Sequence, residues 1–114
     1  MVAARETRQD IMKVVEQIAR EFHPQRVILF GSHAYGAPMP DSDVDLLVVM
    51  PVEGKEVYKA AEIRKCIDHP FPLDLLVRTP QNLQWRLEQG NFFLREIVER
   101  GQVLYEAADA GVGC

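Results

Sequence analysis

The 114-residue sequence has no long apolar run that could form a helix across a bilayer, since no segment of 18 or more apolar residues is present. Its first ten residues, MVAARETRQD, contain no apolar signal core, so we expect a cytoplasmic protein without a membrane partner. A chain of this length forms about one domain. We expect that domain over residues 1–106, followed by a disordered tail over residues 107–114.

The sequence also has no excess of positive charge, because 13 Lys and Arg stand against 17 Asp and Glu and give a formal net charge of −4. Nonspecific nucleic-acid binding depends on Lys and Arg that neutralise phosphates, so we do not expect a long nucleic acid as a partner. The two cysteines, Cys66 and Cys114, have the spacing of neither a metal site nor a disulfide framework. We expect both to be reduced thiols.

The order of predicted helices and strands indicates an α/β fold, with helices packed against a small sheet. Thr7 is the predicted cap of the first helix, and His23-Pro24 is its predicted stop. Glycine and proline between 36 and 40 leave room for at most one helical turn after Ser32. The predicted elements are a helix over 11–22, strands over 26–30 and 44–50, a helix over 56–68 with Val57, Ala60, Ala61 and Arg64 on one side, a strand over 73–77, helical segments between Thr79-Pro80 and Gly101, and an edge strand over 103–105.

Aspartates stand at the start of two apolar strands. Asp43 and Asp45 alternate in one strand, so their side chains share a face about 6.6 Å apart along the backbone and can bind one hard cation. Asp74 begins another strand, and if the two strands are neighbours the three carboxylates meet at one end of the sheet. Burial of an unpaired carboxylate costs several kcal/mol, so the leucines around Asp45 and Asp74 favour metal ligation. Asp41 is interpreted as a loop carboxylate.

Gly31-Ser32 follows the first strand and enters a helical turn, where free backbone N–H groups and a hydroxyl can face an anion such as a phosphate. This dipeptide alone is a weak signal, but it lies a dozen residues before the Asp pair. His33 is interpreted as a turn or surface histidine rather than a catalytic one. Together these residues predict a phosphate site and metal ligands in one unit.

Several other motifs are excluded by spacing. A calcium-binding EF-hand loop that began at Asp41 would need glycine at its sixth position and glutamate at its twelfth, where the chain has Leu46 and Val52. No Gly-Lys-Ser/Thr follows Gly31, which excludes a Walker phosphate loop, and no G-x-G-x-x-G or G-x-S-x-G is present.

The combination resembles the DNA polymerase beta-like nucleotidyltransferase superfamily. Its signature, G-S-x-x-x-G followed by D-x-D on the next strand and a third Asp on a later strand, corresponds to Gly31 to Gly36, Asp43-Val44-Asp45 and Asp74. The phrases VILFGS, SDVDLLVV and FFLREIVERGQVLYE are similar to those of the minimal nucleotidyltransferases, and the resemblance covers nearly the whole chain. It implies the core of that superfamily, a small mixed sheet with helices packed on it.

The resemblance also implies roles for the site residues. Asp43, Asp45 and Asp74 would be the catalytic residues and would bind two Mg²⁺ ions, with Asp74 also helping to deprotonate the acceptor hydroxyl. Gly31 and Ser32 would bind the β- and γ-phosphates of the nucleotide. The implied reaction transfers a nucleoside monophosphate, AMP from ATP in the leading interpretation, and releases pyrophosphate.

Two departures from the family pattern bear on function. Many minimal members carry arginine where this chain has Tyr35, which offers a polyphosphate no charge, and Arg64 or Lys65 are the candidates to replace it. Larger relatives carry a further domain that binds the acceptor, and we expect none within these 114 residues. The acceptor is therefore expected on another chain or a dimer mate.

The leading interpretation is a protein adenylyltransferase that acts as an antitoxin, with a tyrosine of a HEPN-domain toxin as acceptor, because minimal members are commonly encoded beside such a toxin. A small-molecule acceptor of the antibiotic type is one alternative. A non-catalytic module that binds its partner by contact alone is the other. The helical spacing of Trp85, Phe92 and Phe93 is more typical of core residues than of a homo-oligomer surface.

Overall fold

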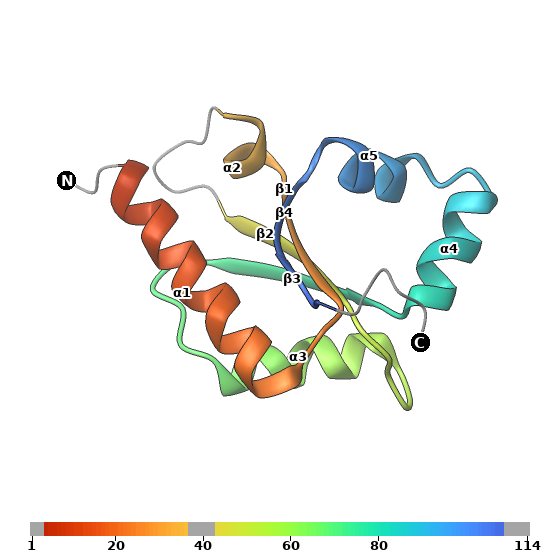
Figure 1. Cartoon of the computed structure of the whole chain (residues 1–114), viewed down its shortest axis with the longest axis horizontal. Coiled ribbons are helices and arrows are strands. Elements are labelled where there is room, and N and C mark those ends of the chain that lie inside the picture. The colour runs from red at the N-terminus through yellow and green to blue at the C-terminus, as the bar shows by residue number, and fades with distance from the viewer. Residues whose placement is uncertain (1–3, 37–42, 109–114) are drawn as a thin grey trace.

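The computed structural model describes residues 4–36 and 43–108, which form a four-stranded sheet covered by helices on both faces (Figure 1). The sheet order is β3-β2-β1-β4. β1 is antiparallel to β2 and to β4, whereas β2 and β3 are parallel, so the sheet is mixed. The elements are α1 (Ala4–Phe22), β1 (Arg26–Phe30), α2 (Ser32–Tyr35), β2 (Val44–Val49), α3 (Glu56–Cys66), β3 (Leu73–Arg78), α4 (Pro80–Glu88), α5 (Phe92–Arg100) and β4 (Gln102–Glu106).

The central strand β2 is buried on both faces because successive side chains of a strand point to opposite sides of the sheet. Leu46 and Val48 belong to the core that α1 and α3 cover. Leu47 and Val49 belong to the second core, beneath α4 and α5. The predicted α/β fold with a small mixed sheet and helices packed on it is confirmed, and odd-numbered residues of β2 face α4 and α5.

Several predicted boundaries are confirmed together with their local causes. His23 has a φ of 51° and ends α1 just before Pro24. Thr79 caps α4, and its Oγ1 accepts a hydrogen bond from Asn82 N at 3.0 Å. The edge strand β4 forms where an edge strand was expected, and Ala107 N still donates to Gln25 O at 2.9 Å. Most of the expected tail, residues 109–114, lies outside the described residues.

Two helix details differ from the sequence predictions. α1 begins at Ala4, so Thr7 lies inside the helix and does not cap it, because the surrounding Ala, Arg, Glu and Gln are strong helix formers. The buried face of α3 consists of Ala60 and Ile63, whereas Val57 is 66% exposed. The larger Ile63 sets this face, since burying its side chain removes more apolar area from water than burying Ala61 would.

The core interpretation of three aromatic residues is wrong. Trp85 is 56% exposed, Phe92 86% and Phe93 55%, although all three stand at helical spacing in α4 and α5. The inward positions of this helix pair are taken by Leu83, Leu94 and Ile97 instead. The α4–α5 pair therefore presents aromatic rings outward. No helix of residues 4–36 or 43–108 is long and apolar enough to cross a membrane.

Candidate active site

The predicted carboxylates meet at the beginning of the two parallel strands. Asp45 of β2 and Asp74 of β3 are register partners, and their side chains share a hydrogen bond. Asp45 has the same parity in β2 as Leu47 and Val49, so this pair lies on the sheet face that α4 and α5 partly cover. The sequence predicted this meeting on the condition that the two strands are neighbours, and the structure fulfils that condition.

Asp45 lies in an electrostatic environment that disfavours its ionised form. The pKa of Asp45 is raised to about 6, mainly by desolvation and then by the negative charges of Asp74 and Asp43 and the hydrogen bond with Asp74. The charge of His33 acts in the opposite direction and lowers this pKa. Like charges at short distance are the usual cause of such a shift in a carboxylate pair. Among the causes that act on Asp45, those that disfavour its negative charge therefore outweigh the effect of His33.

The donor set fits a magnesium ion. Mg²⁺ is usually bound by one or two carboxylates, and water and substrate phosphates complete its shell. Asp45 and Asp74 supply two such carboxylates, and the exposed Asp43 lies close enough to affect the pKa of Asp45. Within residues 4–36 and 43–108 no group of three or more His, Cys, Asp or Glu side chains is placed to hold a metal ion. The arrangement is an open pair with a third carboxylate nearby, which leaves coordination positions for a substrate.

Gly31 makes room for the Asp45 side chain. Phe30 is the register partner of Asp45, so Gly31 follows β1 directly beside this carboxylate. Gly31 has a φ of 76°, a region that residues with a Cβ rarely adopt, and a Cβ at this position would overlap Asp45 Oδ2. Glycine is therefore required here for backbone conformation and for space.

Ser32 begins the single turn of α2. Ala34 N and Tyr35 N both donate to Gly31 O, at 3.0 and 3.1 Å, so the turn closes on Gly31. The N–H of a first helical residue has no partner within its helix. The Ser32 hydroxyl also has no hydrogen-bond partner in the part of the chain that the structure describes. Ser32 thus keeps two donors available beside the carboxylate pair.

Tyr35, at the position where the family resemblance led us to expect arginine, has a cation from elsewhere in the chain beside it. The Arg100 guanidinium lies 5.0 Å from the centre of the Tyr35 ring. Arg64 and Lys65 are on α3, which packs on the opposite face of the sheet from Asp45, so neither is placed to replace the missing arginine. Sequence reasoning missed Arg100 because the pairing of β4 with β1 brings it there, and no local motif marks it.

Two features lie apart from this site. Asp41 falls outside the described residues, so the loop interpretation stays a prediction. A hollow of about 510 Å³ lies at the other end of β3, around Arg78, and includes none of the predicted site residues. The chemistry proposed from the sequence is therefore on an open surface rather than in that hollow.

The chain thus has a mixed α/β sheet that brings two carboxylates together beside a Gly-Ser turn. The family model described as nucleotidyltransferase domain matches residues 11–104 of the chain. The chain belongs to this family and is an enzyme of the nucleotidyltransferase class, as the sequence resemblance predicted.

Solved structures show the same fold at low sequence identity. A candidate nucleotidyltransferase from Sulfolobus solfataricus superposes with a TM-score of 0.59 at 20% identity, over 86% of this chain and 78% of the other. A toxin-antitoxin with AMP-PNP gives 0.54 at 19% identity, over 89% and 78%. A mutant of the toxin-antitoxin MntA-HpeT gives 0.52 at 17%, over 86% and 75%. A search of curated proteins gave no match.

Proposed function

We propose that this protein transfers a nucleoside monophosphate from a nucleoside triphosphate, AMP from ATP, to a hydroxyl group with release of pyrophosphate. The observation that carries the proposal is the Asp45–Asp74 pair on adjacent parallel strands, directly beside Gly31. Mg²⁺, as two ions bound by Asp43, Asp45 and Asp74, would neutralise the phosphates and stabilise the entering and leaving oxygens.

The chain's own residues divide the remaining work. Gly31 and Ser32 bind the β- and γ-phosphates through N–H and hydroxyl donors. Arg100, beside Tyr35, adds positive charge near the same phosphates. The acceptor oxygen forms a bond to the α-phosphorus while the bond from that phosphorus to the pyrophosphate oxygen breaks. Asp74 is exposed, so it is accessible to the acceptor hydroxyl and receives its proton.

A protein is the acceptor that the surface supports. Phe93 packs edge-on against Phe30, with ring centres 5.8 Å apart, and Phe30 is the register partner of Asp45. Phe93 therefore places one exposed aromatic ring next to the strand end that carries the site, and Trp85 and Phe92 are further exposed aromatics of α4 and α5. Exposed aromatic rings of this kind are enriched where protein partners bind. We propose a tyrosine of a HEPN-domain toxin as the acceptor and a cytoplasmic antitoxin role, as part of a toxin-antitoxin pair.

One alternative is kept because a specific residue favours it. Tyr35 replaces a cation that many relatives have, and a chain that had lost catalysis could still neutralise its partner through the aromatic surface. Against this alternative, an unused carboxylate pair destabilises the fold through repulsion and desolvation.

The test uses ATP labelled at either the α- or the γ-phosphate, Mg²⁺ and, as the acceptor, the protein encoded beside this gene. The α-label should appear on a tyrosine of that protein and the γ-label should not, which separates adenylylation from phosphorylation. Asp45→Ala should abolish labelling, and the matched surface variant Arg64→Gln should retain it. Full neutralisation of the toxin by Asp45→Ala would support contact alone. If no label appeared on the partner protein or on small molecules that carry a hydroxyl group, the proposed nucleotidyl transfer would be contradicted.

A further inference from the structure

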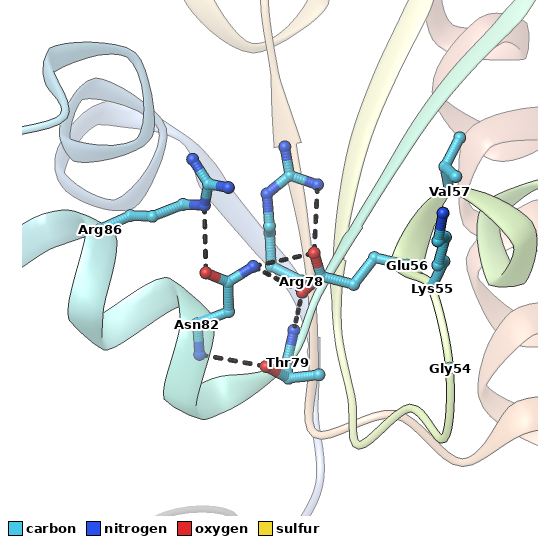
Figure 2. A pocket seen from close by; sticks show the side chains of 8 residues that line it. All are labelled: Gly54, Lys55, Glu56, Val57, Arg78, Thr79, Asn82 and Arg86. Atoms are coloured by element: carbon cyan, nitrogen blue, oxygen red, sulfur yellow. Dashed lines mark hydrogen bonds and ion pairs between the residues drawn. The ribbon is translucent and has the colours of Figure 1, made fainter.

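We propose that the hollow at the end of β3 is a second anion site, which binds a phosphate group through Arg78 and Arg86. The hollow has a volume of about 510 Å³ and lies between the beginning of α3, the end of β3 and α4 (Figure 2). Its charged and polar lining consists of Lys55, Glu56, Arg78, Thr79, Asn82 and Arg86.

A chain of hydrogen bonds fixes the orientation of Arg86. Glu56 accepts from Asn82 Nδ2 at 2.8 and 2.9 Å, and its Oε2 also accepts from Thr79 N at 2.8 Å. Asn82 Oδ1 in turn accepts from Arg86 Nε at 3.1 Å. Arg86 is thus held through Nε alone, and its two Nη groups have no acceptor among the residues that the structure describes.

Arg78 is partly buried and has few hydrogen-bond acceptors among the described residues. Its Nη1 donates to Val77 O at 2.8 Å and lies 4.0 Å from Glu56 Oε1, the outer limit of an ion pair. Its Nε is buried and, in the described ranges, has no partner. A purely structural arginine would be expected to have its buried donors paired. Arg78 and Arg86 both line the hollow, and in the view of Figure 2 both guanidinium groups lie on the same side of Asn82.

The charge of the lining selects the ligand class. Lys55, Arg78 and Arg86 contribute three positive charges and Glu56 one negative charge, which leaves a balance of two positive charges. A phosphate group carries roughly −1.5 to −2 at neutral pH and accepts hydrogen bonds from several directions. A carboxylate would balance only half of the charge. Two guanidinium groups with spare Nη donors match a phosphate, because arginine binds this group with two parallel N–H donors.

This site is separate from the candidate active site and does not rest on the proposed reaction. Arg78 and Asp74 have the same parity in β3 and so share a sheet face, but four residues separate them, about 13 Å along the strand. One phosphate group therefore cannot contact Gly31 and Ser32 and also lie in the hollow. The source of the phosphate is either the free ion or the phosphate of a nucleotide.

The test is a titration of the metal-free, isotope-labelled protein, with chelator present and ionic strength held constant, followed by amide and arginine Nε NMR signals. Inorganic phosphate and AMP are the two ligands, and adenosine is the control without phosphate. We expect saturable shifts at residues 54–57 and 79–86 and at the Nε of Arg78 and Arg86. Tighter binding of AMP would identify a nucleotide as the source, and equal binding would identify free phosphate. Shifts with adenosine at these residues would overturn the proposal.

Variants provide the second readout. Arg86→Gln should weaken phosphate binding about tenfold or more, and Arg86→Lys, which keeps the charge but not the fork of donors, should weaken it several-fold. The matched control Arg64→Gln removes a positive charge on α3 away from the hollow and should leave binding unchanged. Equal affinity of all variants, or shifts centred on Gly31 and Ser32, would overturn the assignment.

Discussion

The two ends of β3 place carboxylates in opposite surroundings. At its beginning, Asp45 and Asp74 lie beside Asp43, and the pKa of Asp45 rises to about 6. At its end, Glu56 accepts hydrogen bonds from Thr79 N and Asn82 Nδ2 and lies beside Arg78. One end thus brings like-charged carboxylates together, and the other has a carboxylate that accepts several hydrogen bonds from the protein.

The comparison shows that a carboxylate can have two different roles in this fold, depending on the charges and donors around it. A carboxylate crowded by like charge weakens the fold by itself and gains from a cation that comes with the substrate. A carboxylate surrounded by donors strengthens the fold and orients its neighbours, here Asn82 and through it Arg86. Substitutions at the two ends should therefore affect different properties, activity at Asp45 and stability at Glu56.

The largest expected effect is on catalysis at the carboxylate end. Asp45→Ala should reduce the rate of nucleotidyl transfer by about 10³-fold or more, because the proposed function makes Asp45 a metal ligand. Initial rates of label transfer measure this loss. Arg64→Gln, exposed on the opposite face of the sheet, should keep the full rate. If Asp45→Ala lowered the rate less than tenfold, the carboxylate end of β3 would not be the catalytic end.

Gly31→Ala should give the next largest loss, about 10²-fold in rate together with a free energy of unfolding lowered by about 1–3 kcal/mol. The added Cβ would displace the Asp45 carboxylate as well as strain the backbone. Gly90→Ala is the matched control, because Gly90 has a similar φ of 84° with no atom within 4 Å of an added Cβ. Gly90→Ala should lower the free energy of unfolding through backbone strain but should leave the rate of nucleotidyl transfer unchanged. Equal rates in the two variants would mean that Gly31 serves the backbone alone.

Much of the carboxylate end could be predicted from the sequence because local patterns encode it. The alternation of Asp43 and Asp45, the Gly31-Ser32 turn and the apolar strand around Asp74 are each contained in a few consecutive residues. Only the adjacency of β2 and β3 had to be assumed. The structure supplies it as a parallel pairing with Asp45 opposite Asp74.

The arginine end could not be predicted because its residues come from three elements that no motif connects. Glu56 begins α3, Arg78 ends β3 and Arg86 lies in α4. Their meeting depends on tertiary packing and on the orientation of Asn82. The exposed positions of Trp85, Phe92 and Phe93 were missed for a related reason. Helical spacing identifies residues that share a face, but it does not determine which face the sheet covers.

The third prediction concerns stability at the arginine end. Glu56→Gln should lower the free energy of unfolding by about 1–2 kcal/mol. The glutamine NH₂ group would face Thr79 N or Asn82 Nδ2, which are themselves donors and now donate to the Glu56 carboxylate. Chemical denaturation at neutral pH measures this change. Glu62→Gln is the control, since Glu62 forms an exposed ion pair with Lys59 and should change stability by less than about 0.5 kcal/mol. A Glu56→Gln variant as stable as Glu62→Gln would mean that the network contributes little.

The smallest expected effect has the opposite sign, at the carboxylate end. With chelator present at pH 7.5, Asp45→Asn should raise the free energy of unfolding on the order of 1 kcal/mol, a value discounted from the pKa shift because Asp45 is partly exposed. The folded-state pKa of about 6 lies above the unfolded value near 3.9, so the folded protein binds this proton more tightly. The wild type is therefore most stable relative to the variant below about pH 4 and loses that stability as the pH rises to about 6.

Denaturation curves of both proteins across this pH range measure the crossover. The increase in the free energy of unfolding of Asp45→Asn over the wild type should be absent near pH 4 and complete above pH 6. It should shrink when Mg²⁺ and ATP are added, because only the wild type gains a cation between its carboxylates. A variant less stable than the wild type at pH 7.5 without metal would show that Asp45 resembles Glu56, a carboxylate that the protein itself satisfies. The contrast between the two ends of β3 would then be lost.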